Sequence, residues 1–227
     1  MKGYVQELFT SIQGEGIYIG QRQTFVRFLG CNRACEYCDT PGARVQTGTF
    51  EYHSQQFENP VDAEFITQKI TERAVTITGG EPLLQPDFLA EICKSLKILG
   101  KEVYLETNGT LPDALQRVIG FVDTVALDFK VESATGEKTP WDAHARSLKI
   151  AAQKDTFVKI CVNHTISSQE IASVCNVIKS VDERIPLVIQ PVVLKPIAPY
   201  MDIQRQALCR LPDVRIIPQI HKYLGLR

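Results

Sequence analysis

The sequence predicts an α/β fold, a partial (β/α)6 barrel similar to a shortened TIM barrel. Short apolar runs alternate along the chain with stretches of helical periodicity, which is typical of parallel βαβ units. The chain has 227 residues, fewer than the about 250 of a complete (β/α)8 barrel. Right-handed crossovers place each loop that follows a strand on one face, where active sites of such folds are built. We expect one domain over residues 1–227.

The expected strands are apolar or β-branched runs bounded by Gly, Pro or Asn. Six of them cover residues 24–29, 74–78, 103–107, 124–129, 156–162 and 187–192, and a weaker seventh covers 214–218. Helices are expected where apolar residues recur three or four positions apart. They cover residues 62–73, 86–99, 113–119, 141–153 and 168–181. The remaining stretch 39–60 has no clear helical period, and we expect its second part, 52–60, to lie over the site.

Charge and hydropathy exclude several classes of protein. Lys and Arg total 25 against 26 Asp and Glu, so a net charge of −1 provides no field that would attract nucleic acid or an anionic membrane. No apolar run approaches the roughly 20 residues that span a bilayer. The first sixteen residues show no apolar targeting segment. We therefore expect a cytoplasmic protein without nucleic-acid or membrane partners.

The seven cysteines are an odd number in a chain expected among reduced thiols, so disulfides explain them poorly. Three of them, Cys31, Cys35 and Cys38, directly follow the first expected strand. A structural zinc site would need a fourth ligand, for which His53 is a candidate. Three thiolates also suit a [4Fe–4S] cluster, normally held by four, with one iron left open. The other four are expected to be small buried hydrophobic residues: Cys93, Cys161, Cys175 and Cys209.

The CxxxCxxC spacing after the first strand resembles the signature of the radical S-adenosylmethionine (SAM) superfamily. The resemblance implies a partial barrel of the radical SAM type, with these cysteines as cluster ligands. The open iron would bind SAM, which is then cleaved to methionine and a 5′-deoxyadenosyl radical. Tyr37 would lie near the adenine. The GGEP motif after the second strand resembles the loop that contacts the SAM amino group. There Gly79 and Gly80 would allow a close backbone approach, and Glu81 offers a carboxylate.

Polar residues at two later strand ends suit the hydroxyl groups of a nucleoside. Glu106 and Asn108 close the third strand, and turn or capping roles are the alternative. Asp128 and Lys130 close the fourth strand, where they could equally form a structural ion pair.

Four segments outside the cluster motif bear on the substrate. The first is IQGEG at 12–16, whose amide and carboxylate can bind the edge of a flat heterocycle. The second is Arg27, a strand residue whose guanidinium would need an anionic partner inside a barrel, such as a substrate carboxylate. The third and fourth are DTP at 39–41 and PQIHK at 218–222. Together with the cysteine motif they resemble the 7-carboxy-7-deazaguanine synthase (QueE) family along the whole chain.

This resemblance implies a radical ring contraction of 6-carboxy-5,6,7,8-tetrahydropterin to 7-carboxy-7-deazaguanine, with loss of ammonia, in the biosynthesis of queuosine and related 7-deazapurines. Arg27 would face the substrate carboxylate, and Thr40 would ligate Mg²⁺, with a turn cap as the alternative. Gln190 would contact the cofactor. The implied substrate contacts are Ile12, Gln13, Gly14, Glu15, Arg27, Thr78, His221 and Arg227. A solvated tail is the alternative for His221, and six residues follow it, so the reach of Arg227 is an open question.

The family resemblance also implies a homodimer and an electron donor such as flavodoxin or ferredoxin. Another small radical SAM enzyme, such as a glycyl-radical activase, is the nearest alternative. A non-enzymatic zinc-binding module is the alternative from a different class.

Overall fold

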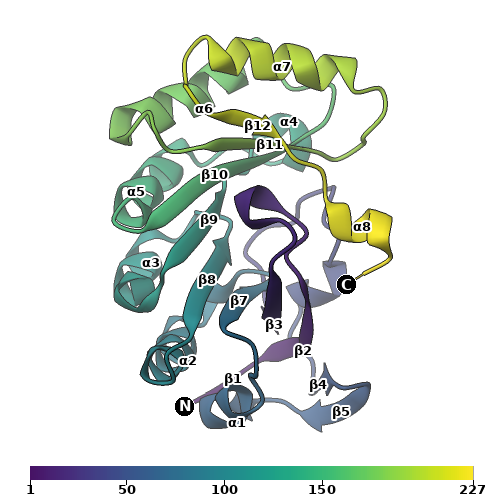
Figure 1. Cartoon of the computed structure of the whole chain (residues 1–227), viewed down its shortest axis with the longest axis vertical. Helices are drawn as coiled ribbons and strands as arrows, with labels where there is room; N and C mark the ends of the chain where they lie inside the picture. The colour runs from purple at the N-terminus through teal and green to yellow at the C-terminus, as the bar shows by residue number, and fades with distance from the viewer. Residues whose placement is uncertain (227) are drawn as a thin grey trace.

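A sheet of ten strands dominates the computed structural model, which describes residues 1–226. Its order is β12-β11-β10-β9-β8-β7-β3-β2-β4-β5, and neighbours from β3 to β12 are parallel. These parallel strands are β3 (Arg22–Phe28), β7 (Ala74–Gly79), β8 (Glu102–Thr107), β9 (Thr124–Asp128), β10 (Asp155–Val162), β11 (Leu187–Pro191) and β12 (Val214–Ile216). The six expected strands and the weak seventh are therefore confirmed, in a curved sheet that stays open (Figure 1).

Five further strands were not predicted. β2 (Val5–Ile12) runs antiparallel to β3, and a register shift between Val5 and Glu7 interrupts its alternation. This bulge removes the period of two by which a strand is recognised. The others form a small hairpin and a two-stranded sheet: β4 (Thr49–Tyr52), β5 (Gln55–Glu58), β1 (Lys2–Gly3) and β6 (Val61–Asp62). The hairpin β4–β5 extends the sheet beyond β2, so the expectation that residues 52–60 cover the site is wrong.

Helices cover the convex face of the sheet, as Figure 1 shows. The five expected helices form, although the first is shorter than predicted. The set is α1 (Ala63–Gln68), α2 (Pro86–Ile98), α3 (Pro112–Val118), α4 (Glu132–Thr135), α5 (Trp141–Ala151), α6 (Ser168–Val181), α7 (Ala198–Leu208) and α8 (Ile220–Leu224). The unpredicted α7 packs a narrow stripe of Tyr200, Ile203 and Ala207, and α8 crosses the open side of the sheet (Figure 1). None of the helices within residues 1–226 is long and apolar enough to cross a membrane.

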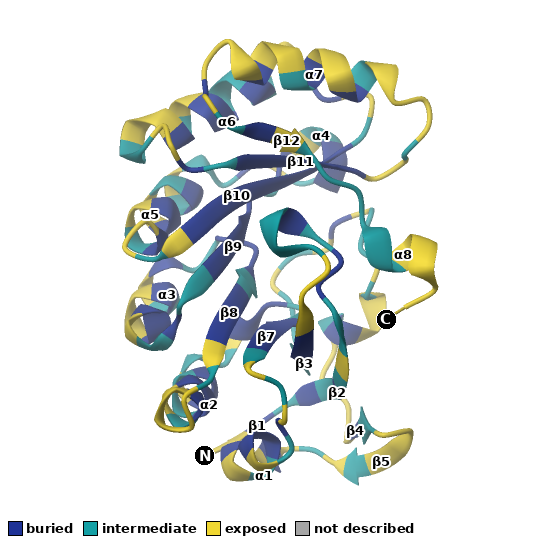
Figure 2. Cartoon of the chain, in the orientation of Figure 1, coloured by how far each residue is buried: buried dark blue, intermediate teal, exposed yellow. Residues whose placement is uncertain are grey.

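The main core lies between the sheet and helices α1 to α7, whose buried positions lie on the side facing the sheet (Figure 2), whereas α8 has no buried residue. On the concave face the side chains of the strands change from apolar to polar toward the carboxyl ends. Strands β8 to β11 contribute one residue each to a second apolar cluster: Tyr104, Ala126, Phe157 and Val188. Ile17 and Tyr18, from the loop between β2 and β3, pack against this cluster. Two positions further on, the inward residues are Glu106, Asp128, Lys159 and Gln190. The concave face therefore has an apolar floor and a polar upper part at the carboxyl ends of the strands.

Candidate active site

A cavity of about 540 Å³ lies on the concave face, within the size range of small-molecule sites. Residues from the carboxyl-terminal parts of six parallel strands, β3 and β7 to β11, contribute to its wall, together with the cysteine loop, the loop after β2 and the C-terminal segment. Nearly every residue predicted for the site lines it. The exceptions are Glu81, which is absent from the wall, and Arg227, which lies outside the described residues.

The three clustered cysteines all line the cavity, on the loop that follows β3. The Cys38 amide donates to the Cys35 carbonyl at 3.2 Å, and Arg44 donates to that same carbonyl at 2.5 Å. Burial is the main cause that raises the pKa of the Cys31 and Cys35 thiols. Because thiolates are the metal-binding form, metal binding at this loop would release protons.

A structural zinc site is closed by four protein ligands. His53, the candidate fourth ligand, lies exposed in the turn of the β4–β5 hairpin and not in the cavity wall. Three thiols without that fourth ligand suit a [4Fe–4S] cluster with one iron left open.

The glycines of the GGEP loop make a close backbone contact within the protein, and their predicted contact with SAM stays a prediction. A side chain at Gly80 would place its Cβ less than 3.0 Å from the Gly30 carbonyl oxygen, and one at Gly79 would meet the Phe28 backbone. The Gly80 amide donates to the Phe28 carbonyl at 3.1 Å. Both glycines line the cavity, but their lack of a side chain is required by the backbone that leads into the cysteine loop.

Glu81 does not offer its carboxylate to the cavity. Its side chain is fully buried and accepts hydrogen bonds from the Leu83 amide, the Thr107 hydroxyl and the Asn108 amide. Burial raises the pKa of Glu81 to about 7 despite these donors. We correct the predicted cofactor contact accordingly: Glu81 ties the turn after β7 to the end of β8, because a buried carboxylate needs donors on both oxygens.

Asn108 has a turn role and also lines the cavity, while its contact with the cofactor stays a prediction. It lines the cavity, while its amide nitrogen donates to Asn32 of the cysteine loop at 2.9 Å. Its side-chain oxygen accepts from the Thr110 amide at 3.0 Å, as in a turn. The Asn108 side chain therefore joins the end of β8 to the loop that carries the cysteines.

Asp128 and Lys130 form an ion pair of 2.8 Å inside the cavity wall, so the ion pair and the lining position coexist. The Lys130 ammonium also donates to the Tyr37 hydroxyl at 3.1 Å and lies 5.2 Å from the centre of its ring. Burial alone would lower the pKa of Lys130, but Asp128 and its other neighbours hold it well above its usual value. His144 on α5 supports this strand end, because its Nε2 accepts from the Lys130 amide at 3.0 Å.

Two buried oxygen atoms beside this ion pair have no hydrogen-bond partner. They are Asp128 Oδ1 and Gln190 Oε1. The Gln190 amide nitrogen is held by Cys161 Sγ at 3.5 Å. Orphaned buried acceptors are rare in native proteins and indicate a missing partner. Since both residues line the cavity, hydroxyl or amino groups of a nucleoside-sized cofactor would satisfy them.

Glu106 groups with the residues predicted for the substrate rather than with Asn108. Its carboxylate accepts from Gln13 at 3.0 Å and from Thr78 at 2.8 Å. Gln13 is buried, and its side-chain oxygen accepts from the Glu15 amide at 3.0 Å. Hence the loop after β2 is fixed against the ends of β7 and β8.

Arg27 already has an anionic partner within the protein. Its Nε donates to Glu7 Oε1 at 2.7 Å, and its guanidinium lies 5.7 Å from the centre of the Phe9 ring. These residues line the cavity together. The guanidinium keeps further donors, so it can bind a second carboxylate beside Glu7.

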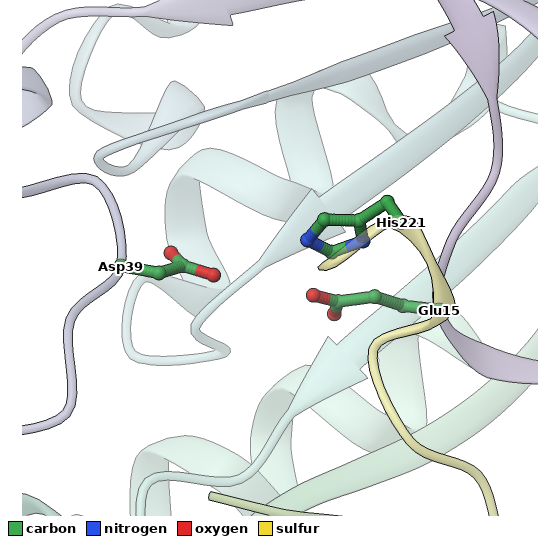
Figure 3. Close-up of side chains that lie close together, drawn as sticks. All are labelled: Glu15, Asp39 and His221. Carbon is green, nitrogen blue, oxygen red and sulfur yellow. The ribbon is translucent and has the colours of Figure 1, made fainter. Parts of the chain in front are cut away.

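Glu15, Asp39 and His221 converge from three distant parts of the chain (Figure 3). Their ligand atoms lie within 4.8 Å of one another. Gln219 bridges the two carboxylates, donating to Glu15 at 2.5 Å and to Asp39 at 2.8 Å. Burial would raise the pKa of Glu15, but the Lys159 ammonium and hydrogen bonds from Lys159 and Gln219 bring it down to about 2. Glu15 is therefore a permanent hydrogen-bond acceptor in the cavity.

Thr40 lines the cavity beside this group, with its hydroxyl 3.5 Å from Asp39 Oδ1. It is also the first residue of the turn that leads into a short 3₁₀ helix, but its side chain makes no capping hydrogen bond. The Thr40 hydroxyl therefore does not cap the turn, which was the alternative to its predicted role as a metal ligand. His221 packs against Gly14, where a side chain would collide with the imidazole, so it is not a solvated tail residue.

Several wall residues were not predicted from the sequence, above all Asp39, Lys159, Cys161 and Gln219. Asp39 and Gln219 belong to the DTP and PQIHK segments, which were already singled out in the sequence. Membership in these segments could have identified both residues as candidates for the site. Cys161 is buried as predicted, and its Sγ also lies 3.9 Å from Asp128 in the cavity wall. Cys93 and Cys175 are buried as predicted, whereas Cys209 is exposed near the end of α7, which corrects that expectation.

Comparison with known proteins decides the family. Residues 25–166 match the model of the radical SAM superfamily. The 7-carboxy-7-deazaguanine synthase of Geobacter sulfurreducens is 36% identical over 97% of this chain and 96% of that protein. That of Archaeoglobus fulgidus is 36% identical over the full length of both. The chain belongs to the 7-carboxy-7-deazaguanine synthase family.

The fold of this synthase family member agrees with a solved relative. The crystal structure of QueE from Escherichia coli matches with a TM-score of 0.63 at 20% identity, over 95% of this chain and 93% of that one. The agreement confirms the α/β partial barrel of the radical SAM type.

Proposed function

We propose that this member of the 7-carboxy-7-deazaguanine synthase family converts 6-carboxy-5,6,7,8-tetrahydropterin to 7-carboxy-7-deazaguanine with loss of ammonia. The observation that carries the proposal is that one cavity contains two complementary sets of residues. One set is the cysteine loop with the polar ends of β9 and β11, and the other is the loop after β2 with Arg27 and His221.

Cys31, Cys35 and Cys38 would hold a [4Fe–4S] cluster, which supplies the electron for reductive cleavage of bound SAM. Around that cofactor, Asp128 and Gln190 provide the unpartnered acceptors described above. Tyr37 and Lys130 lie on the same side of the cavity and are paired with each other. Asn108 holds the cysteine loop in place through Asn32.

The opposite side of the cavity would bind the pterin. Glu15 remains ionised and can accept from the N–H groups of an aminopyrimidinone edge, while the Gln13 amide lies beside it. Arg27 would bind the substrate carboxylate in addition to Glu7. Thr78, whose hydroxyl donates to Glu106, would also contact the substrate.

Mg²⁺ is proposed near Thr40, where it would help to hold the substrate carboxylate. The Thr40 hydroxyl is free of a capping role, and the adjacent Asp39 carboxylate adds negative charge. A hard cation of this kind prefers oxygen ligands and keeps several waters. The proposal also includes a homodimer, a cytoplasmic location and a reductant of the flavodoxin or ferredoxin type.

Anaerobic turnover tests the reaction. The reconstituted protein, SAM, a reductant and the carboxypterin should yield 7-carboxy-7-deazaguanine, identified by mass spectrometry, with one ammonia per product. Cleavage of SAM without any consumption of the pterin would contradict the proposal and favour an activase. A colourless protein with one zinc and no iron or sulfide would contradict the cluster as well.

A further inference from the structure

Lys159 is a buried lysine in the middle of the cavity wall. It lies in β10, where its backbone pairs with Asp128 of β9 and Val188 of β11. Its side chain is 11% exposed. A lysine is rarely buried to this extent unless its charge is paired, so the partners of the ammonium group indicate why it is there.

The Lys159 ammonium lies between carboxylates from the two halves of the cavity. It donates to Glu15 Oε2, and it lies 3.5 Å from Asp128 Oδ2. Glu15 belongs to the side proposed for the pterin, and Asp128 to the side proposed for SAM. Burial alone would lower the pKa of Lys159, but these carboxylates hold it well above its usual value. The Lys159 ammonium is therefore protonated and positively charged near neutral pH.

The two carboxylates depend on Lys159 to different degrees. Asp128 has a second and closer cation, Lys130, at 2.8 Å. Within residues 1–226, Lys159 is the lysine or arginine that forms an ion pair with Glu15, and the partner on its other oxygen is the neutral amide of Gln219. Loss of the Lys159 charge would leave Asp128 paired but would leave Glu15 as a buried anion without a cation.

We propose that Lys159 is a positioning residue for the pterin, which it serves by fixing Glu15, and that it is not required for SAM binding. The proposal rests on the proposed function of the site, because it uses Glu15 as an acceptor for the heterocycle. A buried carboxylate that loses its charged partner becomes mispositioned or protonated. Either change would weaken acceptance of N–H groups from the substrate.

Lys159→Met tests the proposal in the reconstituted enzyme, because Met keeps the aliphatic stem and removes the charge. We expect KM for the carboxypterin to rise at least about tenfold, as for truncation of one partner of a buried charge pair. KM for SAM and SAM cleavage without pterin should stay within about twofold of the wild type. Lys159→Arg should recover part of the pterin affinity. Lys149→Met, at an exposed position of α5, is the control and should change neither KM.

A double-mutant cycle shows whether Lys159 acts through Glu15. Glu15→Gln alone should raise KM for the pterin with little change for SAM, and adding Lys159→Met should raise it by less than about twofold more. If Lys159→Met folds poorly, Glu15→Gln still tests the proposal. By itself it must raise KM for the pterin and leave KM for SAM nearly unchanged. Lys130→Met should show the opposite split, with a larger effect on SAM.

Calorimetric titration of the pterin into the wild type and each variant tests the proposed function and the proposed role of Lys159 separately. If the wild type neither binds nor converts the pterin, the proposed function fails. If it does both and Lys159→Met binds the pterin equally well, the inference about Lys159 is wrong. Equal increases in KM for the pterin and for SAM in Lys159→Met would also overturn it. So would a double variant in which the increases in pterin KM caused by Glu15→Gln and Lys159→Met multiply, because the two residues would then act independently.

Discussion

The Glu81 carboxylate accepts the backbone N–H of Asn108 at 2.7 Å, which joins the turn after β7 to the end of β8. This contact fixes Asn108 and, through its side chain, the Asn32 amide of the cysteine loop. A carboxylate that the sequence assigned to a cofactor thus acts in the framework of the site.

The first prediction concerns the pH dependence of stability. Burial raises the pKa of Glu81 from 4.5 to about 7, so between these values the folded state binds more protons than the unfolded state. The contribution of Glu81 to stability is full below about pH 4.5 and is lost as pH rises through about 7. The free energy of unfolding of the wild type should fall relative to that of Glu81→Gln over this range, by up to about 3 kcal/mol. Urea denaturation of both proteins at several pH values measures it, and a constant difference would refute the assignment.

The second prediction concerns the cluster. Cys35→Ala should abolish iron and sulfide incorporation and SAM cleavage together, because two remaining thiolates cannot hold the cluster. Cys209→Ala, at an exposed position directly after α7, is the matched control and should retain both. Iron and sulfide analysis after anaerobic reconstitution gives the answer. Retention of a full cluster in Cys35→Ala would contradict the ligand assignment.

The third prediction concerns magnesium. Thr40→Ala should keep the cluster and SAM cleavage but weaken the stimulation of product formation by Mg²⁺, since it removes one oxygen ligand. Thr71→Ala, at an exposed position between α1 and β7, serves as the control. Product formation is measured against Mg²⁺ concentration after treatment with a chelator. Full Mg²⁺ dependence in Thr40→Ala would show that the ion binds elsewhere.

The fourth prediction concerns the GGEP loop. Gly80→Ala brings a Cβ within 3.0 Å of the Gly30 carbonyl, so the loop or the cysteine segment must shift, at a cost of about 1–3 kcal/mol. Gly120→Ala meets nothing within 4 Å and should be nearly neutral. Thermal unfolding and iron content of the two variants test this. Equal stability of both would mean that the loop adapts without strain.

The sequence predicted the parallel strands and the main helices because their apolar patterns are local and regular. It did not predict β2, since the bulge at Val5 breaks the period of two. The β4–β5 hairpin was missed for a related reason, because only one of its faces is packed and its residues are mostly polar. The short α7 has only a narrow apolar stripe.

By itself the sequence determined which chemistry is present: three thiols on one loop, and polar residues at the ends of successive strands. Such features survive in the linear pattern because parallel strands bring their ends together in any fold of this class. Only the tertiary structure decided which of these residues face each other. Glu81 is absent from the cavity wall and binds the Asn108 amide, Arg27 forms an ion pair with Glu7, and Lys159 lies between Glu15 and Asp128. The Lys159–Glu15 contact joins residues 144 positions apart, and the other pairings join residues from different strands or turns 20 or more positions apart, so no local pattern encodes them.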